Sequence, residues 1–172
     1  MQYMIQFQFF PKTNKMPDFL NDMISGVFKK NFSSINSELH NHESNRVLEI
    51  LRKDFEKNGY TVEKNKTDSG KIKIPVLFGL NGKMEKSFDA DAYNSQFKTV
   101  VEVEAGRGYT NYQFLKDFFE ALVMNDIDYL VIAVRNIYRK SNDFDKVIRF
   151  FDAIYTSERF NCPLKGLLVI GY

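Results

Sequence analysis

The run YLVIAV at positions 129–134 constrains the fold of this chain most, because it has no polar face. A run of strand length that is apolar on both sides is typical of a strand covered by other elements above and below. Ahead of it, apolar residues recur at helical spacing over positions 114–122, and an alternating strand ends at Ala105. A strand, a helix and a second strand in this order predict a parallel pair joined by a right-handed crossover.

The patterns on either side of this unit predict further layers around the same sheet. Positions 164–172 are apolar and strand-like, and positions 5–9 alternate as in a half-buried strand. Three more helices are expected from the spacing of their apolar residues: positions 19–28, a helix that starts at Ser37 or Ser44 and stops at Asn58, and positions 144–154 after a cap at Ser141 or Asn142. We therefore expect an α/β protein with a mixed central sheet flanked by helices on both faces.

At 172 residues the chain is long enough for one compact domain. We expect a single domain over residues 1–172, in which residues 1–36 form an extension of one strand and one helix and residues 37–172 form the core. No run of 18 apolar residues suggests a membrane span, and the N-terminal stretch lacks the basic region of a signal peptide. The single Cys162 excludes an internal disulfide, so we expect a cytoplasmic protein with no membrane partner.

Two short runs of alternating apolar and acidic residues lie in the middle of the chain, in the stretch FDADAYNSQFKTVVEVEAGRG. Asp89 and Asp91 are two apart, so both side chains leave the same face of an extended strand, and the same holds for Glu102 and Glu104. An Asn-Ser pair between the runs favours a turn. The stretch therefore predicts a hairpin that gathers up to four carboxylates on one sheet.

Such a cluster is costly unless something offsets its charge. Two unit charges about 5 Å apart at an effective dielectric near 20 repel each other by roughly 3 kcal/mol. The cluster is therefore either the well-solvated face of an ordinary sheet or a site that binds a cation. Basic residues are gathered in two places, six lysines between Lys64 and Lys86 and the group Arg135, Arg139 and Lys140. With a net charge of only +2, these clusters leave open a solvated surface or a contact with nucleic acid.

The order of these elements resembles a known superfamily. An Asp in one strand, a Glu-x-Lys motif or a variant of it in the next, then a helix and a buried strand, is the layout of the PD-(D/E)xK nucleases, the restriction-endonuclease-like fold. The resemblance covers roughly residues 37–134. The matching positions are Asp91, or Asp89, and then Glu102, while Glu104 stands where the family has its lysine.

This resemblance implies a restriction-endonuclease-like core with a bound Mg²⁺ or Mn²⁺ ion. Asp91 and Glu102 would hold the ion, with the main-chain carbonyl of Val103 as a further ligand and Asp89 as the alternative to Asp91. Glu43 lies in the preceding helix, where many of these nucleases carry an additional acidic group. Mg²⁺ needs only two or three carboxylates besides water and a phosphate oxygen, so this set is sufficient.

The catalytic roles that the resemblance implies fall on Glu104 and on nearby basic residues. Glu104 would orient or deprotonate the attacking water, as glutamate does at this position in some type II restriction enzymes. Without the family's lysine, positive charge would come from Arg107, from Lys116 or from a second metal ion. Arg107 could instead pair with Glu102 or Glu104 for structural reasons.

The function expected first is metal-dependent hydrolysis of DNA phosphodiester bonds, by a homodimer because cutting both strands needs two sites. A second hypothesis is a catalytically silent protein of the nuclease fold that binds nucleic acid or a protein partner. A third is another enzyme that uses a carboxylate pair, such as a glycosidase, which the absence of Trp for sugar stacking makes less favourable.

Overall fold

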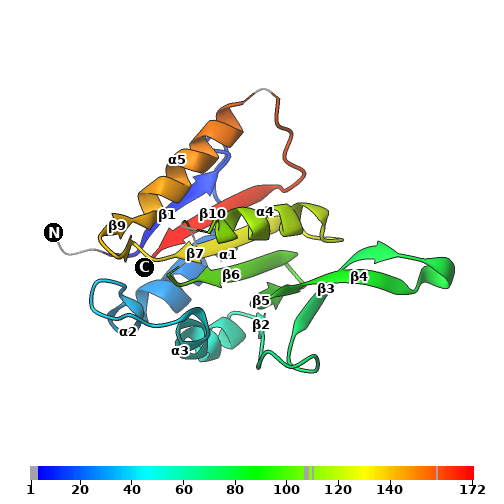
Figure 1. The fold of residues 1–172 in the computed structure, drawn as a ribbon, viewed down its shortest axis with the longest axis horizontal. Coiled ribbons are helices and arrows are strands. Elements are labelled where there is room, and N and C mark those ends of the chain that lie inside the picture. Colours follow the sequence, from blue (N-terminus) through cyan, green and yellow to red (C-terminus); the bar gives the residue numbers. More distant parts are fainter. Residues whose placement is uncertain (1–3, 107–108, 110, 158) are drawn as a thin grey trace.

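A computed structural model describes residues 4–106, 109, 111–157 and 159–172 of the chain (Figure 1). Arg107, for which a catalytic role is predicted, lies outside the described residues. The described part is a mixed α/β fold around a six-stranded sheet with the strand order β1-β10-β7-β6-β5-β2. No helix among the described residues is long and apolar enough to cross a membrane.

The elements follow one another along the chain as follows. The strands of the central sheet are β1 (Gln6–Phe10), β2 (Thr61–Val62), β5 (Ala92–Asn94), β6 (Thr99–Glu104), β7 (Tyr129–Val134) and β10 (Gly166–Gly171). The helical elements are α1 (Asp18–Met23), a π-helical segment η1 (Ile24–Lys29), α2 (Phe32–Ile35), α3 (Ser44–Lys57), a 3₁₀ turn η2 (Leu80–Gly82), α4 (Gln113–Val123) and α5 (Asp143–Thr156). Two separate strand pairs complete the fold, β3 (Ile72–Phe78) with β4 (Met84–Ala90) and β8 (Ile137–Tyr138) with β9 (Ser141–Asn142).

The centre of the sheet is parallel, as the apolar run at 129–134 predicts. β7 pairs in parallel with β6 on one side and with β10 on the other, and α4 makes the crossover from β6 to β7. The remaining pairs of the sheet are antiparallel. All residues of β7 except Tyr129 are buried, because elements cover both faces of this strand.

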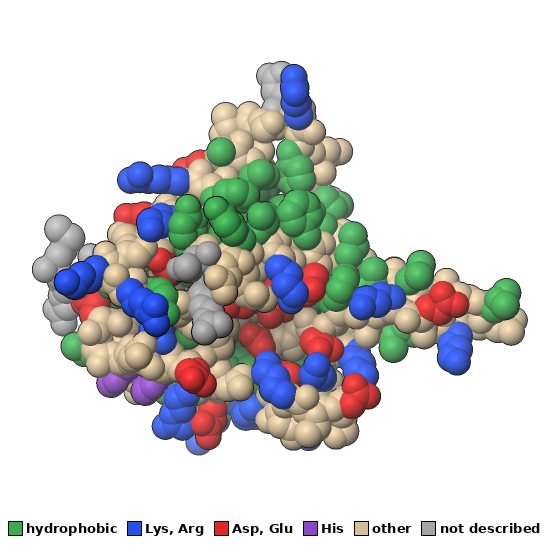
Figure 2. Space-filling model, in the orientation of Figure 1, with side chains coloured by type: hydrophobic (Ala, Val, Ile, Leu, Met, Phe, Trp, Pro, Cys, Tyr) green, Lys and Arg blue, Asp and Glu red, His purple; other side chains and the backbone are tan. Residues whose placement is uncertain are grey.

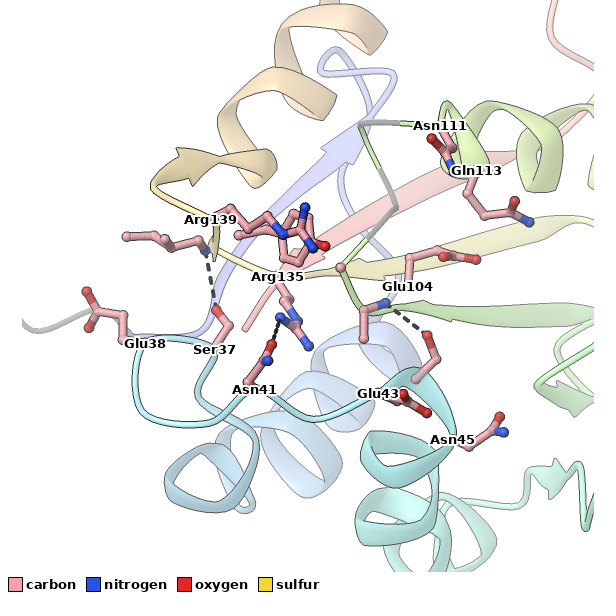
Figure 3. Close-up of a pocket in the computed structure, with 15 residues that line it drawn as sticks. Ser37, Glu38, Asn41, Glu43, Asn45, Glu104, Asn111, Gln113, Arg135 and Arg139 are labelled. Atoms are coloured by element: carbon pink, nitrogen blue, oxygen red, sulfur yellow. Dashed lines mark hydrogen bonds between the residues drawn. The ribbon is translucent and has the colours of Figure 1, made fainter.

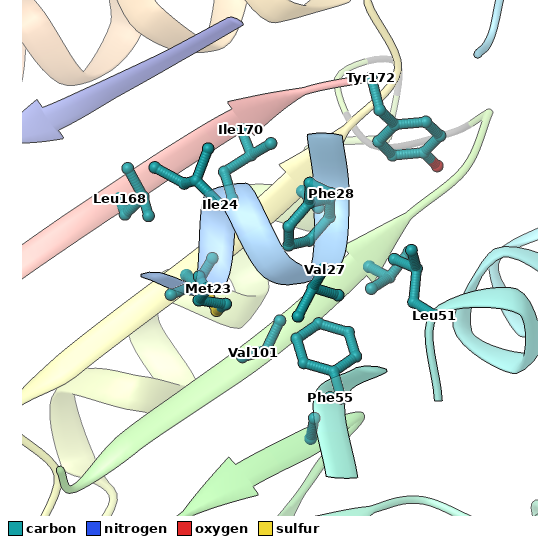
Figure 4. Packing of buried hydrophobic residues seen from close by; sticks show 14 of the residues in the cluster. Met23, Ile24, Val27, Phe28, Leu51, Phe55, Val101, Leu168, Ile170 and Tyr172 are labelled. Atoms are coloured by element: carbon teal, nitrogen blue, oxygen red, sulfur yellow. The ribbon is translucent and has the colours of Figure 1, made fainter. Parts of the chain in front are cut away.

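Two apolar cores lie on opposite faces of the sheet, so the prediction of helices on both faces is confirmed. On one face α1, η1 and α3 pack on the sheet, and the rings of Phe28 and Phe55 lie 5.7 Å apart (Figure 4). On the other face α4 and α5 pack on the sheet, and the rings of Phe118 and Phe151 lie 5.0 Å apart.

The N-terminal segment, expected as an extension, is packed into this same unit. β1 pairs along β10, from Gln6 opposite Gly171 to Phe10 opposite Leu167. Behind it, the apolar face of α1 and η1 is fully buried in the first core.

The predicted acidic hairpin differs from the observed one, because its first strand changes partner. Residues up to Ala90 belong to β4 and pair with β3, whereas residues from Ala92 belong to β5 and pair with β6. β3 and β4 form an arm that projects from the body of the protein (Figure 1). Pro75 lies in β3, which among the described residues pairs with β4. β2 contains only two residues.

Asp54, a buried residue of α3, binds the two residues that follow η1, Lys30 and Asn31. Its Oδ1 atom accepts a hydrogen bond from Lys30 Nζ at 2.5 Å, and its Oδ2 atom accepts one from Asn31 Nδ2 at 2.9 Å. The hydrogen bond from Asn31, and then the one from Lys30, hold the pKa of the carboxyl group below its ordinary value of 3.8.

Asp54→Ala is expected to lower the free energy of unfolding by about 1–3 kcal/mol near neutral pH, because both donors lose their acceptor. A carboxyl whose pKa is lowered by folding stabilises the fold only while it is ionised. The loss should therefore shrink as the pH falls below 3.8. Urea denaturation near pH 7 and at about pH 3 measures both effects.

Asp152→Ala is the matched control for this substitution. It removes an ion pair with Lys12 in which the side chains are 49% and 38% exposed, and such pairs contribute less than about 1 kcal/mol. An equal loss of stability in the two variants would contradict the role assigned to Asp54.

Candidate functional site

The β5–β6 hairpin brings Asp91 beside Glu102. Ala92 lies opposite Val101 in this antiparallel pair, so Asp91, just before Ala92, comes level with Glu102, just after Val101. Asp91 Oδ2 accepts a hydrogen bond from the main-chain N–H of Val103 at 2.8 Å. The predicted juxtaposition of these two acids across a hairpin is present in the structure.

Asp89, the alternative to Asp91, is separated from this pair by the change of partner strand. It lies in β4 opposite Lys73, and its side chain is 43% exposed. Its Oδ2 atom lies 2.6 Å from Lys71 Nζ in an ion pair. Asp89 reaches the rim of the recess that contains Asp91, but its charge is already matched by a lysine.

Helix α4 adds further charged groups to the same recess, which has a volume of about 610 Å³. Asp117 is buried and Glu120 half-buried on the face of α4 that lines it. Lys116 lies there too, with Nζ 3.1 Å from Glu120 Oε1. Lys116 is predicted from the sequence, whereas the two acids are not; the signal for them is their spacing of three on a helix that follows Glu104 closely.

A second contribution that the sequence argument missed comes from the loop after β2. The main-chain N–H of Glu63 donates to the carbonyl of Asp91 at 2.8 Å, and the Glu63 side chain is buried. Lys66 Nζ lies 2.6 Å from Glu63 Oε2 and 3.7 Å from Asp91 Oδ1. Figure 2 shows acidic and lysine side chains gathered where the arm joins the body. A lysine thus reaches this site from outside the Glu-x-Glu motif.

Burial and mutual repulsion act together on the central carboxyl groups. Burial, and then the charges of Asp91 and Asp117, raise the pKa of Glu102 well above its ordinary value. Burial also raises the pKa of Asp91, although the hydrogen bond from Val103 and the charge of Lys66 act in the opposite direction. These groups lose water without gaining enough positive charge to compensate.

Glu104 and Asp117 form a second perturbed pair in the site. Burial, followed by the charge of Asp117 and a hydrogen bond to it, raises the pKa of Glu104 to about 9. Burial raises the pKa of Asp117 to about 6. The buried Oδ2 atom of Asp117 has no hydrogen-bond partner among the described residues.

The site fits a divalent cation by its chemistry. Asp91 precedes β5, Glu102 lies in β6 and Asp117 lies in α4. All three offer only oxygen donors, and Lys66 and Lys116 compensate their charge only in part. Mg²⁺ and Mn²⁺ prefer carboxylate oxygen. In the described part of the chain, no three acidic, His or Cys side chains already converge into a metal-binding group. A bound ion would therefore have to draw the carboxylates together or be held partly by water.

The other predicted ligands are placed less directly. Val103 contributes its N–H group, which is bonded to Asp91; a role for its carbonyl stays a prediction. Glu43 is exposed at the start of α3 and lines a neighbouring recess beside Glu104 (Figure 3). It does not line the recess that contains Asp91. The start of α3 is fixed there because Ser44 Oγ accepts a hydrogen bond from the N–H of Ala105 at 2.9 Å.

The comparisons with known proteins assign no family to this chain. No protein-family model matches the sequence, and no curated protein and no solved structure matches it significantly. The function therefore has to be argued from the geometry and the charges of the site.

Proposed function

We propose that the protein is a metal-dependent deoxyribonuclease that hydrolyses phosphodiester bonds, with a restriction-endonuclease-like core of the PD-(D/E)xK type. The observation that carries the proposal is the placement of Asp91 beside Glu102 at the hairpin, with Glu104 two residues further along the same strand. Phosphodiester hydrolysis needs a hard cation and a base at one place. Crowded carboxylates can hold the cation, and one of them can act as the base.

Asp91, Glu102 and Asp117 are the residues that would hold Mg²⁺ or Mn²⁺. When bound, such an ion polarises the phosphate and lowers the pKa of a water molecule. The N–H of Val103 orients Asp91 by bonding its Oδ2 atom, while Oδ1 lies 3.7 Å from Lys66 Nζ. Asp89 is a poorer ligand, since Lys71 already pairs with it.

Glu104 is the proposed general base. Burial, and then the charge of Asp117, raise its pKa to about 9, so in the metal-free protein it is mostly protonated at neutral pH and would have to ionise before it could accept a proton from water. Neutralisation of its acidic neighbours would let it ionise at neutral pH, because the charges of Asp117 and Asp91 contribute to the rise.

Lys66 and Lys116 are the proposed sources of positive charge in place of the missing motif lysine. Lys66 lies on the Asp91 side of the recess, and Lys116 lies on the Glu120 side. Charge that develops on a phosphate between them would be stabilised from both sides. Arg107 stays a sequence prediction.

The test is cleavage of a supercoiled plasmid with Mg²⁺ or Mn²⁺ and with EDTA. The wild-type protein is expected to nick or cut only when the cation is present. Asp91→Asn should lower the rate by about 10²-fold or more, because each 1.36 kcal/mol of lost stabilisation is a factor of ten. Asp89→Asn is the matched control and should keep its rate. Equal cleavage in EDTA, or by Asp91→Asn, would refute the proposal.

The proposal includes a homodimer, because simultaneous cuts in both strands need two sites. A dimer would produce linear plasmid early in the reaction, whereas a monomer would accumulate nicked circles first.

The second candidate is a nuclease-fold protein without catalysis that binds nucleic acid or a protein partner. The observation that favours it is Glu104 at the lysine position, where it adds negative charge to an already crowded site. This candidate predicts no cleavage in any cation. For its nucleic-acid form, it also predicts salt-sensitive binding that EDTA does not change.

A further inference from the structure

A second recess adjoins the acidic site on the other side of Glu104. Its volume is about 880 Å³, and it lies between the start of α3, the end of β6 and the β8–β9 pair (Figure 3). Glu104 and Gln113 line both recesses, so a bound molecule could extend from one into the other. The nuclease proposal above assigns no role to this second recess.

A buried arginine lines this recess. Arg135 follows β7 and is only 6% exposed. One of its terminal nitrogens donates to Asn41 Oδ1 at 2.6 Å, and the other donates to the carbonyl of His42. Both partners are neutral, so they orient the guanidinium group without cancelling its charge.

A second arginine, Arg139, contacts the same aromatic ring as Arg135. The guanidinium carbons of Arg135 and Arg139 are 5.4 Å and 5.2 Å from the centre of the Tyr138 ring. Cation–π contacts hold both groups at this ring. Two like charges so placed favour an anion between or beside them.

The described acids do not supply that anion. Neither arginine takes part in any ion pair formed within the described part of the chain. Glu38 and Glu43 line the recess but are exposed. Asp143 is buried and feels the charge of Arg135, but these two described side chains form no ion pair, and the Asp143 carboxyl accepts a hydrogen bond from Ser141 instead. A buried guanidinium without a charged partner is costly, and a site of this kind is suited to an external anion.

We infer that the recess beside Arg135 and Arg139 binds a phosphate group of the substrate strand, next to the phosphate that is cut. This inference rests on the proposed function and extends it to a substrate-binding subsite. A crowded acidic cluster on one side of Glu104 and, on the other, two arginines that form no ion pair among the described residues suit a cation-bound phosphate followed by a second phosphate of the same strand. Arginine forks match phosphate oxygens in pairs, and a volume of about 880 Å³ is ample for one nucleotide.

The experiment measures binding without catalysis. A fluorescein-labelled single-stranded oligodeoxynucleotide is titrated with the full-length protein in EDTA, and fluorescence anisotropy is recorded at several salt concentrations. Arg139→Ala is the main variant, because Arg139 is exposed and its replacement is expected to leave the fold intact. It should weaken binding about tenfold and reduce the slope of log K against log salt by about 1.

Arg149→Ala is the matched control, since Arg149 is an exposed arginine of α5 that does not line the recess. It should bind as the wild type does. The inference is overturned if the wild type does not bind, if Arg139→Ala binds as tightly as the wild type, or if both variants lose affinity equally. Arg135→Lys, checked for folding by thermal denaturation, should also weaken binding, because an ammonium group cannot form the same fork.

Plasmid cleavage separates a failure of this inference from a failure of the proposed function. Cation-dependent cleavage with unaltered binding by Arg139→Ala would reject the subsite and leave the nuclease. Binding that depends on Arg139 without any cleavage would reject the nuclease and leave the subsite in a silent nucleic-acid-binding protein.

Discussion

Glu102→Gln is expected to remove metal-dependent cleavage and at the same time to stabilise the metal-free protein. Glutamine keeps the size of the side chain but removes one negative charge from the most crowded position. Cleavage should fall by about 10²–10³-fold, because losing a cation ligand costs several kcal/mol of transition-state stabilisation. Stability should rise, because burial and the charges of Asp91 and Asp117 oppose the ionised form of this group.

Thermal denaturation with and without Mg²⁺ measures both halves of this prediction. A ligand that binds only the folded protein stabilises it by about 2.7 kcal/mol at 100 times its dissociation constant, so the wild type should gain stability from the ion. The variant should start from a higher midpoint in EDTA and gain less from Mg²⁺. A lower midpoint in EDTA would contradict the description of the site as an uncompensated acidic cluster.

Glu104→Gln is expected to flatten the dependence of stability on pH. The pKa of Glu104 is about 9 in the folded protein against an ordinary value of 4.5. A carboxyl whose pKa is raised by folding contributes its stability fully below pH 4.5, and the contribution is lost as the pH rises towards 9. As a single group, such a shift corresponds to about 3 kcal/mol between pH 4.5 and neutral pH.

Urea denaturation of metal-free protein from about pH 5 to about pH 9 tests this effect. The wild type should lose stability steadily over this range, whereas Glu104→Gln should lose less and be the more stable protein at the alkaline end. The glutamine can also donate a hydrogen bond to the unpartnered Oδ2 atom of Asp117. Glu56→Gln, at an exposed position of α3, is the control and should follow the wild type. Parallel curves for all three proteins would refute the prediction.

Both predictions describe one compromise between stability and function. The charges that destabilise the metal-free fold are those that would hold a cation and accept a proton. Half-buried carboxyl groups with raised pKa values are more typical of functional sites than of the solvated face of a sheet.

Much of the fold could be predicted from local patterns. The apolar run of β7 and the helical stripe of α4 lead directly to the parallel centre of the sheet, because burial on both faces leaves a periodic record in the sequence. Asn142, one of the two predicted caps, was predictable because capping is local: its side chain accepts a hydrogen bond from the N–H of Asp145 within one turn. The break between β4 and β5 leaves no such record, because both halves alternate in the same way.

The candidate site was predictable only where its members lie on one hairpin. Asp91 and Glu102 are found by alternation and by the turn between them, as is the ambiguity between Asp91 and Asp89. Glu63 and Lys66 could not be found, because they lie outside the hairpin and a lone charged residue in a loop carries no signal of its own. For Asp117, the only signal is its spacing of three from Glu120 on α4.

The sequence by itself determined the sheet, its parallel centre, the helices on both faces and the presence of acids at the end of β6. Only the tertiary structure decided which acids meet. In the folded protein Asp89 pairs with Lys71, Asp117 lies close enough to Glu104 to raise its pKa, and Lys66 lies near Asp91. The physical reason is that periodicity records which face of an element is buried, whereas the distance between charged groups depends on how separate elements pack, and repulsion and desolvation act through that distance.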